Sequence, residues 1–211
     1  MNNLSRPNAT QLTAMLILLL ASLSVSASTI LIHGDSLSAG YGLQQGEEWP
    51  ALLQNKLSQN GLDYTIVNTS ISGETTNGGL ARFVSTFEQY QPALVILALG
   101  ANDGLRGQPL GQTEENLAAM IRHSQKNDAQ VLLLGIRIPP NYGSRYSNAF
   151  HQMYFSLQQT FDIPLLPFML EGVAGHDELM QIDGLHPEAD AQPIIMANVW
   201  QSLKPLLRNQ P

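Results

Sequence analysis

The sequence predicts an α/β fold built on a parallel β-sheet. Five short apolar segments alternate with stretches of helical spacing, and this alternation implies right-handed crossovers between parallel strands. The five segments are also nearly free of interior charge, as expected of strands that helices cover on both faces. The predicted strands are Thr29–His33, Tyr64–Asn68, Leu94–Leu99, Val131–Ile136 and Ile163–Leu166.

The stretches between these strands carry apolar residues at helical spacing. Within Leu80–Phe87 they stand at i, i+3, i+4 and i+7, which places them on one face of a helix. Thr113 is expected to cap the next helix, because two glutamates follow it in what would be the first turn. The other predicted helices are Trp49–Leu57, Tyr146–Phe161 and Ala191–Leu203.

The first 27 residues have the features of a secretory signal peptide. Arg6 is the only charged residue before an apolar run from Leu12 to Leu23. That run is short of the ~20 residues that a membrane-spanning helix needs, so a cleaved signal is favoured over an uncleaved anchor. Val25 and Ala27 fit the small-residue rule and predict cleavage after Ala27. Residues 28–211 are then expected to form a single periplasmic or secreted domain without a stable membrane anchor.

Composition narrows the class of partner. Removal of a segment with one arginine and no acidic residue leaves 9 basic and 17 acidic residues, a net charge of −8. This balance argues against binding to nucleic acid, whose phosphates require a basic surface. The chain has no cysteine, which excludes disulfides, thiolate metal sites and a lipoprotein anchor. No sustained heptad or long apolar stripe calls for association, so a monomer is predicted.

Small polar residues gather in the loops after the first three predicted strands, in Gly34–Ser38, Ser70–Glu74 and Gly100–Gly104. Parallel α/β sheets bind their ligands outside the carboxyl ends of the strands, so these loops are the expected location of the chemistry. In the first loop, a strand leads directly into Gly-Asp-Ser. This arrangement presents the Ser36 hydroxyl on a tight turn, as suits a nucleophile.

A base and an orienting acid are predicted near the C-terminus. Pro187 is expected in the first turn of a helix, which would put His186 on the turn just before it. Asp183, three residues earlier, can accept a hydrogen bond from one ring nitrogen, while the other nitrogen takes the proton of Ser36. Ser36, Asp183 and His186 are therefore the predicted catalytic residues, and hydrolysis by such a triad requires neither a metal nor a cofactor.

An oxyanion hole needs donors that point to the place where negative charge develops. The candidates are the backbone N–H groups of Ser36 and Gly73 and the side-chain amide of Asn102. Glycine allows close backbone approach because it has no Cβ. Gly73 and Asn102 are each ordinary turn residues by themselves. Their position on adjacent strand-end loops favours the catalytic interpretation.

These residues resemble those of the GDSL, or SGNH, hydrolase family, which is named for four blocks with Ser, Gly, Asn and His. In this sequence the four are Ser36, Gly73, Asn102 and His186. The resemblance covers nearly the whole of residues 28–211 and is carried by Val67–Thr75, Gly100–Gly107, Ile136–Gly143 and Pro164–Phe168.

The resemblance implies a three-layer α/β/α sandwich with a five-stranded parallel sheet, of the flavodoxin-like type. It also implies an acyl-enzyme on Ser36. The implied substrates are acyl thioesters, lysophospholipids, and aryl or short-to-medium-chain esters, and no cofactor is implied.

Two other functions stay open. A carbohydrate O-deacetylase of the same superfamily would use the same triad, and a periplasmic lipid-binding module would use none. The apolar, proline-rich loop Ile138–Gly143 is a candidate wall for an acyl chain and argues against the deacetylase. The complete Ser, Gly, Asn and His set argues against the binding module.

The remaining histidines are given structural interpretations. His33 is expected to be buried at a strand end, and His123 and His151 are expected on the surface of helices. His176 stands beside two acidic residues, but such a group on a loop is usually solvated, so no metal site is predicted there.

The other polar residues near the predicted site are also given structural roles. Asp35 and Asp103 are expected to shape turns through side-chain-to-backbone hydrogen bonds. Arg106 and Arg145 are possible contacts for a phosphate, but surface ion pairs are the expected role of both.

Overall fold

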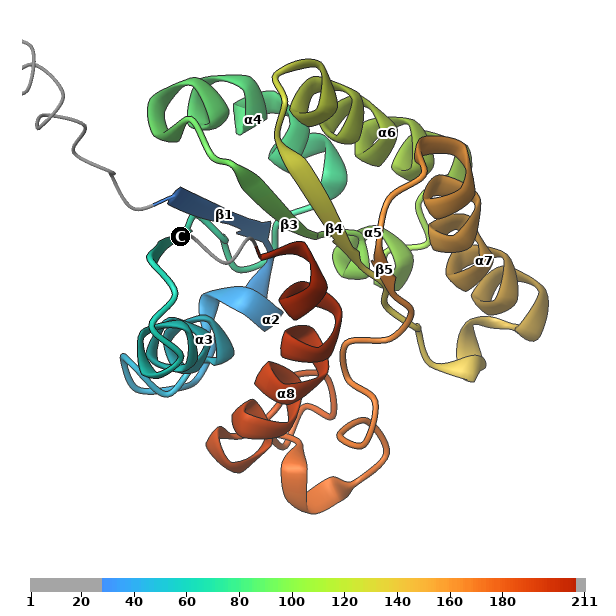
Figure 1. Cartoon of the computed structure of the whole chain (residues 1–211). Helices are drawn as coiled ribbons and strands as arrows, with labels where there is room; N and C mark the ends of the chain where they lie inside the picture. The colour runs from blue at the N-terminus through green and yellow to red at the C-terminus, as the bar shows by residue number, and fades with distance from the viewer. Residues whose placement is uncertain (1–27, 208–211) are drawn as a thin grey trace, which may run out of the picture.

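The structure, a computed structural model, describes residues 28–207. The predicted signal peptide, residues 1–27, lies outside this range. The described residues form a parallel sheet with the strand order β2-β1-β3-β4-β5, which confirms the predicted α/β fold (Figure 1). The strands are β1 (Ser28–Gly34), β2 (Tyr64–Asn68), β3 (Leu94–Ala98), β4 (Gln130–Leu134) and β5 (Leu165–Leu166).

Helices cover both faces of the sheet and give the three layers that the family resemblance implies. One group contains α4, α6 and α7, and the opposite layer contains α3 and α8 (Figure 1). The long helices are α3 (Trp49–Gln59), α4 (Thr76–Tyr90), α6 (Leu110–Lys126), α7 (Ser144–Phe161) and α8 (Gln192–Leu203).

The centre of the sheet determines where the site lies. Strand β1 pairs with β2 on one side and with β3 on the other, so the order of the strands reverses between β1 and β3. At such a point the loops that follow the two strands leave in opposite directions and open a crevice. The segment with Ser36 follows β1, and the segment with Asn102 follows β3.

Two short helices stand where the sequence predicted only loops. They are α2 (Ser36–Ala39) and α5 (Ala101–Leu105). Segments this short contain little more than one turn, so no apolar periodicity reveals them. Each nevertheless fixes a predicted site residue, because Ser36 is the first residue of α2 and Asn102 is the second of α5.

The predicted cap of the third long helix is wrong. Helix α6 begins at Leu110 with Pro109 at its N-cap, so Thr113 is an interior residue of that helix. The Thr113 side chain is buried and its hydroxyl lies 3.4 Å from a carboxylate oxygen of Asp103. Thr113 therefore contacts the core and does not cap the helix.

The last two strands are shorter than predicted. Strand β4 ends at Leu134, and the next N–H, that of Gly135, already donates to the Leu166 carbonyl at 2.8 Å. Strand β5 begins only at Leu165, because the Ile163 N–H still donates to Gln158 in the last turn of α7. Pro164 has no N–H to donate to a neighbouring strand.

Two buried aromatic side chains fix the ends of the central strands. Trp49 is fully buried, and its indole N–H donates to the Leu37 carbonyl in α2 at 3.1 Å. Tyr154 is also fully buried, and its hydroxyl donates to the Leu99 carbonyl just after β3 at 3.0 Å. Buried Trp and Tyr side chains stabilise a fold by packing and also need a partner for the polar tip. Here the polar groups of both side chains form hydrogen bonds to the backbone next to the predicted site.

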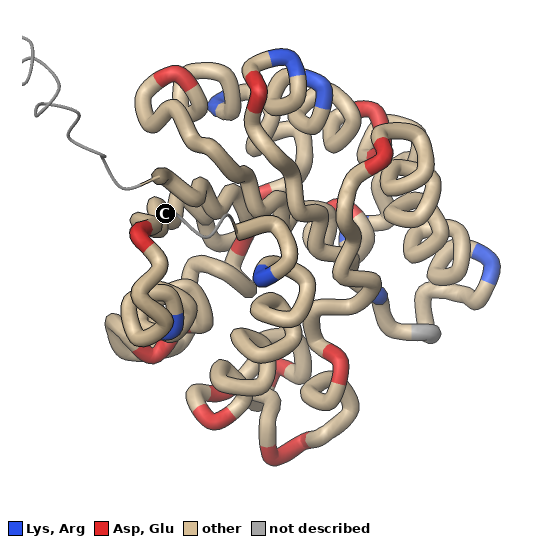
Figure 2. The backbone as a smooth tube through the Cα atoms, viewed as in Figure 1, with Lys and Arg blue, Asp and Glu red and all other residues tan. Residues whose placement is uncertain are grey.

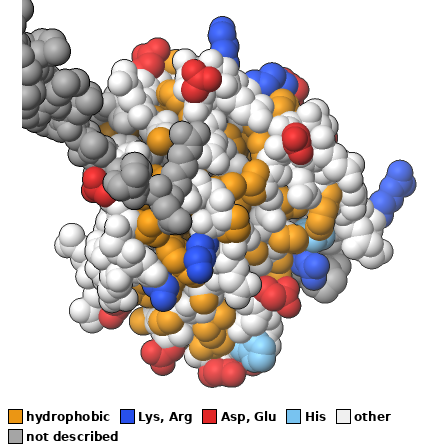
Figure 3. Space-filling view, viewed as in Figure 1, with side chains coloured by type: hydrophobic (Ala, Val, Ile, Leu, Met, Phe, Trp, Pro, Cys, Tyr) orange, Lys and Arg blue, Asp and Glu red, His pale blue; other side chains and the backbone are white. Residues whose placement is uncertain are grey.

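Charged residues are found mainly in helices and outer turns, and the strands in the middle of the molecule carry few (Figure 2). On the face shown in Figure 3, hydrophobic side chains reach the surface in patches that polar and charged atoms separate. Across residues 28–207, no helix has the length and apolar character needed to cross a bilayer.

Candidate active site

Ser36 stands directly after β1, at the start of α2. The Asp35 carboxylate caps this short helix by accepting a hydrogen bond from the Leu37 N–H at 3.1 Å. Gly34 lies close to the backbone of β3, since a Cβ at this position would be 3.0 Å from the Ala98 carbonyl oxygen. The capped turn and the close strand end together fix the Ser36 hydroxyl at the carboxyl edge of the sheet.

The His186 ring lies within hydrogen-bond distance of this hydroxyl. The distance from His186 Nε2 to Ser36 Oγ is 2.9 Å, although 150 positions separate the two residues. The other ring nitrogen, Nδ1, lies 2.6 Å from Asp183 Oδ2. An ionised carboxylate only accepts hydrogen bonds, so Nδ1 carries the proton and Nε2 is left to accept one from Ser36. The structure thus has the geometry that the sequence predicts for these three residues.

Asp183 is held ionised by the turn around it. Desolvation acts to raise the pKa of Asp183, but hydrogen bonds from the His186 ring and from the N–H groups of His186 and Leu185 outweigh it and lower the pKa to about 2. A carboxylate that accepts several hydrogen bonds favours its charged form. Asp183 is therefore a permanent acceptor for the His186 ring at neutral pH.

The prediction that Pro187 stands in the first turn of a helix is wrong. It forms an antiparallel bridge with Met180, and α8 begins only at Gln192. The bridge closes the turn that carries Asp183 and His186. Pro193 takes the place in the first turn of α8 that the sequence had suggested for Pro187.

Gln181 and Tyr41 support this turn, and sequence reasoning missed both. The Gln181 N–H donates to the His186 carbonyl at 2.7 Å, and its side-chain amide donates to the Tyr41 carbonyl at 2.8 Å. The Tyr41 ring lies 4.4 Å from the His186 ring, centroid to centroid. The hydrogen bond from Gln181 to Tyr41 joins segments 140 positions apart, so no local pattern could have indicated it.

The predicted oxyanion donors lie on two loops that hydrogen bonds join. The Asn102 side-chain amide donates to the Glu74 carbonyl at 3.0 Å, which leaves its second N–H free for another acceptor. The Arg106 guanidinium donates to the Gly73 carbonyl at 3.0 Å. Gly73 has a φ of 79°, a conformation that favours glycine. In the part of the chain that the structure describes, the N–H groups of Ser36 and Gly73 donate to no protein acceptor.

The expected surface ion pairs of Arg106 and Arg145 are not formed. Neither guanidinium pairs with a carboxylate of residues 28–207. Arg106 instead binds the Gly73 carbonyl, which lies 33 positions earlier in the chain. A backbone carbonyl as the partner carries no charge pattern that a sequence would reveal.

The two buried aspartates beside the site differ in role. Asp35 shapes its own turn, as predicted, and burial raises its pKa to about 7. Asp103 makes long-range contacts instead of shaping a local turn. It accepts hydrogen bonds from the Thr76 N–H at 2.9 Å and from the Thr76 hydroxyl at 2.5 Å. Asp103 therefore joins α5 to the start of α4, behind the two loops that carry Gly73 and Asn102.

His33 is fully buried at the end of β1, as predicted. Its Nε2 lies 3.0 Å from the Gly79 carbonyl oxygen and its Nδ1 lies 3.2 Å from the Thr69 hydroxyl. Burial, together with the nearby positive charge of Arg82, lowers the pKa of His33 to about 4. The ring is therefore neutral at physiological pH and donates through Nε2 to the carbonyl of α4.

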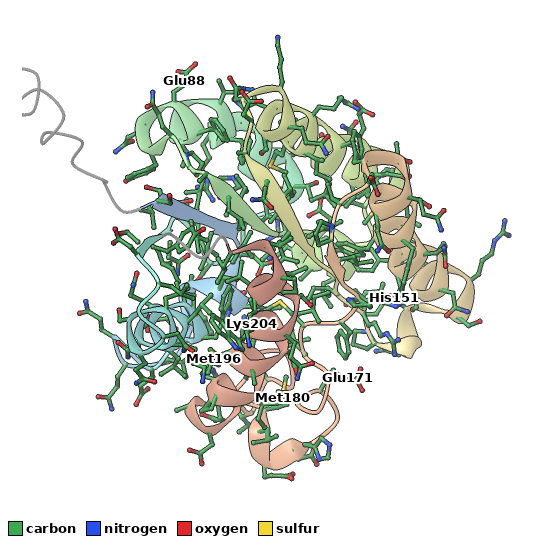
Figure 4. The ribbon with its side chains drawn as sticks, in the orientation of Figure 1. Glu88, His151, Glu171, Met180, Met196 and Lys204 are labelled. Carbon is green, nitrogen blue, oxygen red and sulfur yellow. The ribbon has the colours of Figure 1, made fainter. Side chains whose placement is uncertain are left out.

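Two of the other histidines, His123 and His151, are only partly on the surface. His123 is half-buried, and its ring meets the edges of Phe83 and Phe87 at centroid distances of 5.8 and 5.0 Å. His151 is also half-buried and projects from α7 (Figure 4), where it accepts a hydrogen bond from Arg137. His176 is exposed, and its Nδ1 lies 3.6 Å from the Glu178 carboxylate. The surface interpretation of His123 and His151 is thus wrong in part.

A cavity of about 510 Å³ opens beside Ser36 and His186. Most of its lining is apolar, and it includes Ile138 and Pro139 from the proline-rich loop that the sequence suggested as a wall. Met180, which precedes the His186 turn, also contributes (Figure 4). The lining contains no acidic residue. A cavity of this size and character suits the hydrocarbon part of a small ligand.

The chain is similar over nearly its whole length to two bacterial proteins. It is 48% identical over 196 residues to Esterase TesA of Pseudomonas aeruginosa, which covers 93% of this chain and 98% of that protein. It is 44% identical over 195 residues to the Escherichia coli protein named thioesterase 1/protease 1/lysophospholipase L1, with 92% of each chain covered.

Solved structures and a family model agree with these relatives. The crystal structure of the psychrotrophic esterase EstA from Pseudoalteromonas sp., inhibited by monoethylphosphonate, superposes with a TM-score of 0.81 and 45% identity. That match covers 85% of this chain and 98% of the other. The model of the GDSL-like lipase/acylhydrolase family matches residues 32–192. The chain therefore belongs to the GDSL-like lipase/acylhydrolase family.

Proposed function

We propose that the protein is a serine hydrolase that cleaves acyl esters and thioesters. The observation that carries the proposal is the unbroken line of hydrogen bonds from Asp183 through His186 to Ser36, at the side of an apolar cavity. In this line each group has the role that nucleophilic catalysis requires: a hydroxyl, a base that accepts its proton, and an acid that orients the base.

The reaction proceeds through an acyl-enzyme. Ser36 Oγ attacks the carbonyl carbon while its proton moves to His186 Nε2. The negative charge on the substrate oxygen is met by the N–H groups of Ser36 and Gly73 and by the free N–H of Asn102. His186 then gives its proton to the leaving alcohol or thiol. His186 then accepts a proton from water, whose oxygen attacks the acyl carbonyl carbon. The ester bond to Ser36 Oγ breaks, this oxygen takes the proton from His186, and the carboxylic acid is released.

The apolar cavity is the proposed site of the acyl chain. Burial of hydrocarbon contributes roughly 0.8 kcal/mol per CH₂, so a cavity of about 510 Å³ favours acyl groups longer than acetyl. The names of the Pseudomonas and Escherichia coli relatives, an esterase and a thioesterase and lysophospholipase, support the same substrate classes. We propose acyl thioesters, lysophospholipids, and aryl or short-to-medium-chain esters as substrates.

The carbohydrate O-deacetylase is the second candidate from the sequence, and the apolar lining of the cavity counts against it. Rates on acetyl and octanoyl esters of the same alcohol separate the two functions. A longer acyl chain should raise kcat/KM for the acyl hydrolase, whereas a deacetylase should prefer acetyl.

The place of action is proposed from the sequence. The amino-terminal segment supports export with cleavage after Ala27, and the mature protein is proposed to act as a monomer in the periplasm or outside the cell. Sequencing of the mature amino terminus tests the first point, since an uncleaved chain would retain Met1. Sedimentation of the mature protein tests the second.

Replacement of the nucleophile tests the mechanism. Ser36→Ala is expected to abolish p-nitrophenyl ester hydrolysis while the melting temperature stays near that of the native protein. A fluorophosphonate probe should label the native chain at Ser36 and leave the variant unlabelled. Substantial turnover by the purified variant would contradict the mechanism. If the probe did not label the native protein, the non-catalytic lipid-binding module would be favoured.

A further inference from the structure

Arg137 brings a positive charge to an otherwise apolar cavity. It lines the same cavity as Ser36 and His186, and it is the only lysine or arginine in that lining. It stands between two buried isoleucines of the segment after β4, but its own side chain is exposed. The guanidinium therefore lies at the rim of the cavity, where the lining meets solvent.

Two contacts hold the guanidinium at this rim. Its Nε donates to His151 Nε2 at 3.3 Å, and its carbon lies 5.3 Å from the centre of the Phe168 ring, which also lines the cavity. Stacking on an aromatic face and a hydrogen bond to one edge restrict a side chain that is otherwise flexible. The two terminal nitrogens of the guanidinium remain available to a ligand.

The charge on Arg137 has no carboxylate partner among the described residues. The cavity lining contains no acidic side chain either. An oriented guanidinium without a counter-ion, beside a reactive serine, is a site for an anion.

We propose that Arg137 recognises a phosphoryl group on the alcohol or thiol part of the substrate, and so favours phosphorylated esters and thioesters over neutral ones. This inference rests on the proposed function and deepens it. The acyl chain fills the apolar interior of the cavity, whereas a charged leaving group stays at the solvent-exposed rim, where Arg137 stands. The fork of a guanidinium matches two oxygens of a phosphoryl group.

Pairs of substrates with the same acyl chain test this assignment. Octanoyl-CoA is compared with the octanoyl thioester of N-acetylcysteamine, which has the same reacting bond without phosphates. A lipid headgroup is tested by 1-octanoyl-lysophosphatidylglycerol against 1-octanoylglycerol. For each pair the measured quantity is the ratio of kcat/KM, phosphorylated over neutral. The two arms show whether a nucleotide thioester, a lipid headgroup or both supply the phosphoryl group.

Arg137→Gln is expected to lower this ratio about 10-fold, as for the loss of a charge-assisted hydrogen bond at a partly solvated site. The kcat/KM for the neutral substrates should change less than about 2-fold, since their leaving groups carry no anion. Raising the ionic strength should lower the ratio in the native enzyme and have little effect in the variant. Arg137→Lys keeps the charge without the fork and should give an intermediate ratio.

Arg145→Gln is the matched control. It removes the same charge from the first turn of α7, and Arg145 does not line the cavity. Its ratio should equal that of the native enzyme. His151→Ala removes the acceptor that orients Arg137, together with the contact of the His151 ring with Phe155, and should lower the ratio less than Arg137→Gln does.

The outcomes separate the two levels of inference. Failure of the native enzyme to hydrolyse any of the four substrates would contradict the proposed function itself. Normal turnover of neutral substrates with an unchanged ratio in Arg137→Gln would overturn only the role of Arg137. An equal loss for both members of a pair would also overturn it, because that result would show a role in the shape of the cavity wall.

Discussion

Asp183 holds His186 through both of its carboxylate oxygens. Oδ2 lies 2.6 Å from the ring Nδ1, and Oδ1 accepts the backbone N–H of the same histidine at 3.0 Å. The ring and the backbone of His186 are thus tied to one side chain three residues away. The direction of Nε2 toward Ser36 follows from the turn itself, and a small change in the carboxylate should affect catalysis more than stability.

Asp183→Asn is the substitution that separates these two effects. The amide oxygen can still accept from the backbone of the turn, but its NH₂ group would face Nδ1 and favour the tautomer with the proton on Nε2. We expect kcat for a p-nitrophenyl ester to fall by about 10³–10⁴-fold with little change in melting temperature. A variant that keeps more than a tenth of native kcat would contradict the orienting role of Asp183.

Asn102→Ala removes one proposed oxyanion donor. Because this amide acts on charge that develops in the transition state, kcat should fall by about 10²–10³-fold while KM changes little. Steady-state kinetics with one aryl ester suffice for the measurement. Asn102→Asp keeps the shape but places a negative charge near the oxyanion, so it should be at least as damaging. If the aspartate variant were the more active of the two, Asn102 would not be a donor.

His33 makes the protein less stable in acid. The pKa of His33 is about 4 in the fold and about 6.5 in an unfolded chain, so between these values the unfolded state binds the extra proton. The contribution of His33 to the free energy of unfolding is fully present above pH 6.5 and is lost as the pH falls toward 4. His33→Gln, which can still donate to Gly79, should reduce the loss by about 2–4 kcal/mol. Urea unfolding at pH 7.5 and 4.5 measures the loss of unfolding free energy in each protein. An equal loss in the native protein and in the variant would contradict this role of His33.

Asp35 has the opposite dependence. Its pKa is about 7 in the fold and about 3.8 in the unfolded chain, so in this range the folded state binds the extra proton. Stability therefore falls as the pH rises from 4 to 7. Asp35→Asn can still cap α2 through its amide oxygen, and it should be more stable than the native protein at pH 8 but not at pH 4. A variant that melts below the native protein at pH 8 would show that burial of the charge is not costly here.

Most of the fold follows from apolar periodicity. All five strands and all five long helices have a predicted counterpart, because each buries a continuous or regularly spaced apolar face. The errors lie at the ends. Thr113 has the chemistry of a cap but is buried, with its hydroxyl hydrogen-bonded to Asp103, and Pro187 pairs with Met180 instead of starting a helix. Both are decided by contacts with residues outside the local sequence.

The candidate site divides in the same way. Ser36, Gly73, Asn102 and His186 stand in short motifs whose chemistry can be identified from residue type and spacing. The residues that support these four cannot be identified in that way. Gln181 acts through the carbonyl of Tyr41, and Arg106 acts through the carbonyl of Gly73. Every residue offers the same carbonyl group, so its partner emerges only when the loops are placed in space.

The 150 positions between Ser36 and His186 have a consequence for the timing of activity. A nascent chain carries its nucleophile well before its base, because 150 positions separate the two residues. Hydrolysis therefore begins only after the segment with His186 has been made and has docked beside Ser36. A product truncated before residue 186 would retain the motif around Ser36 and yet be inert, so abundance measured by an antibody to the segment around Ser36 would overstate the amount of enzyme.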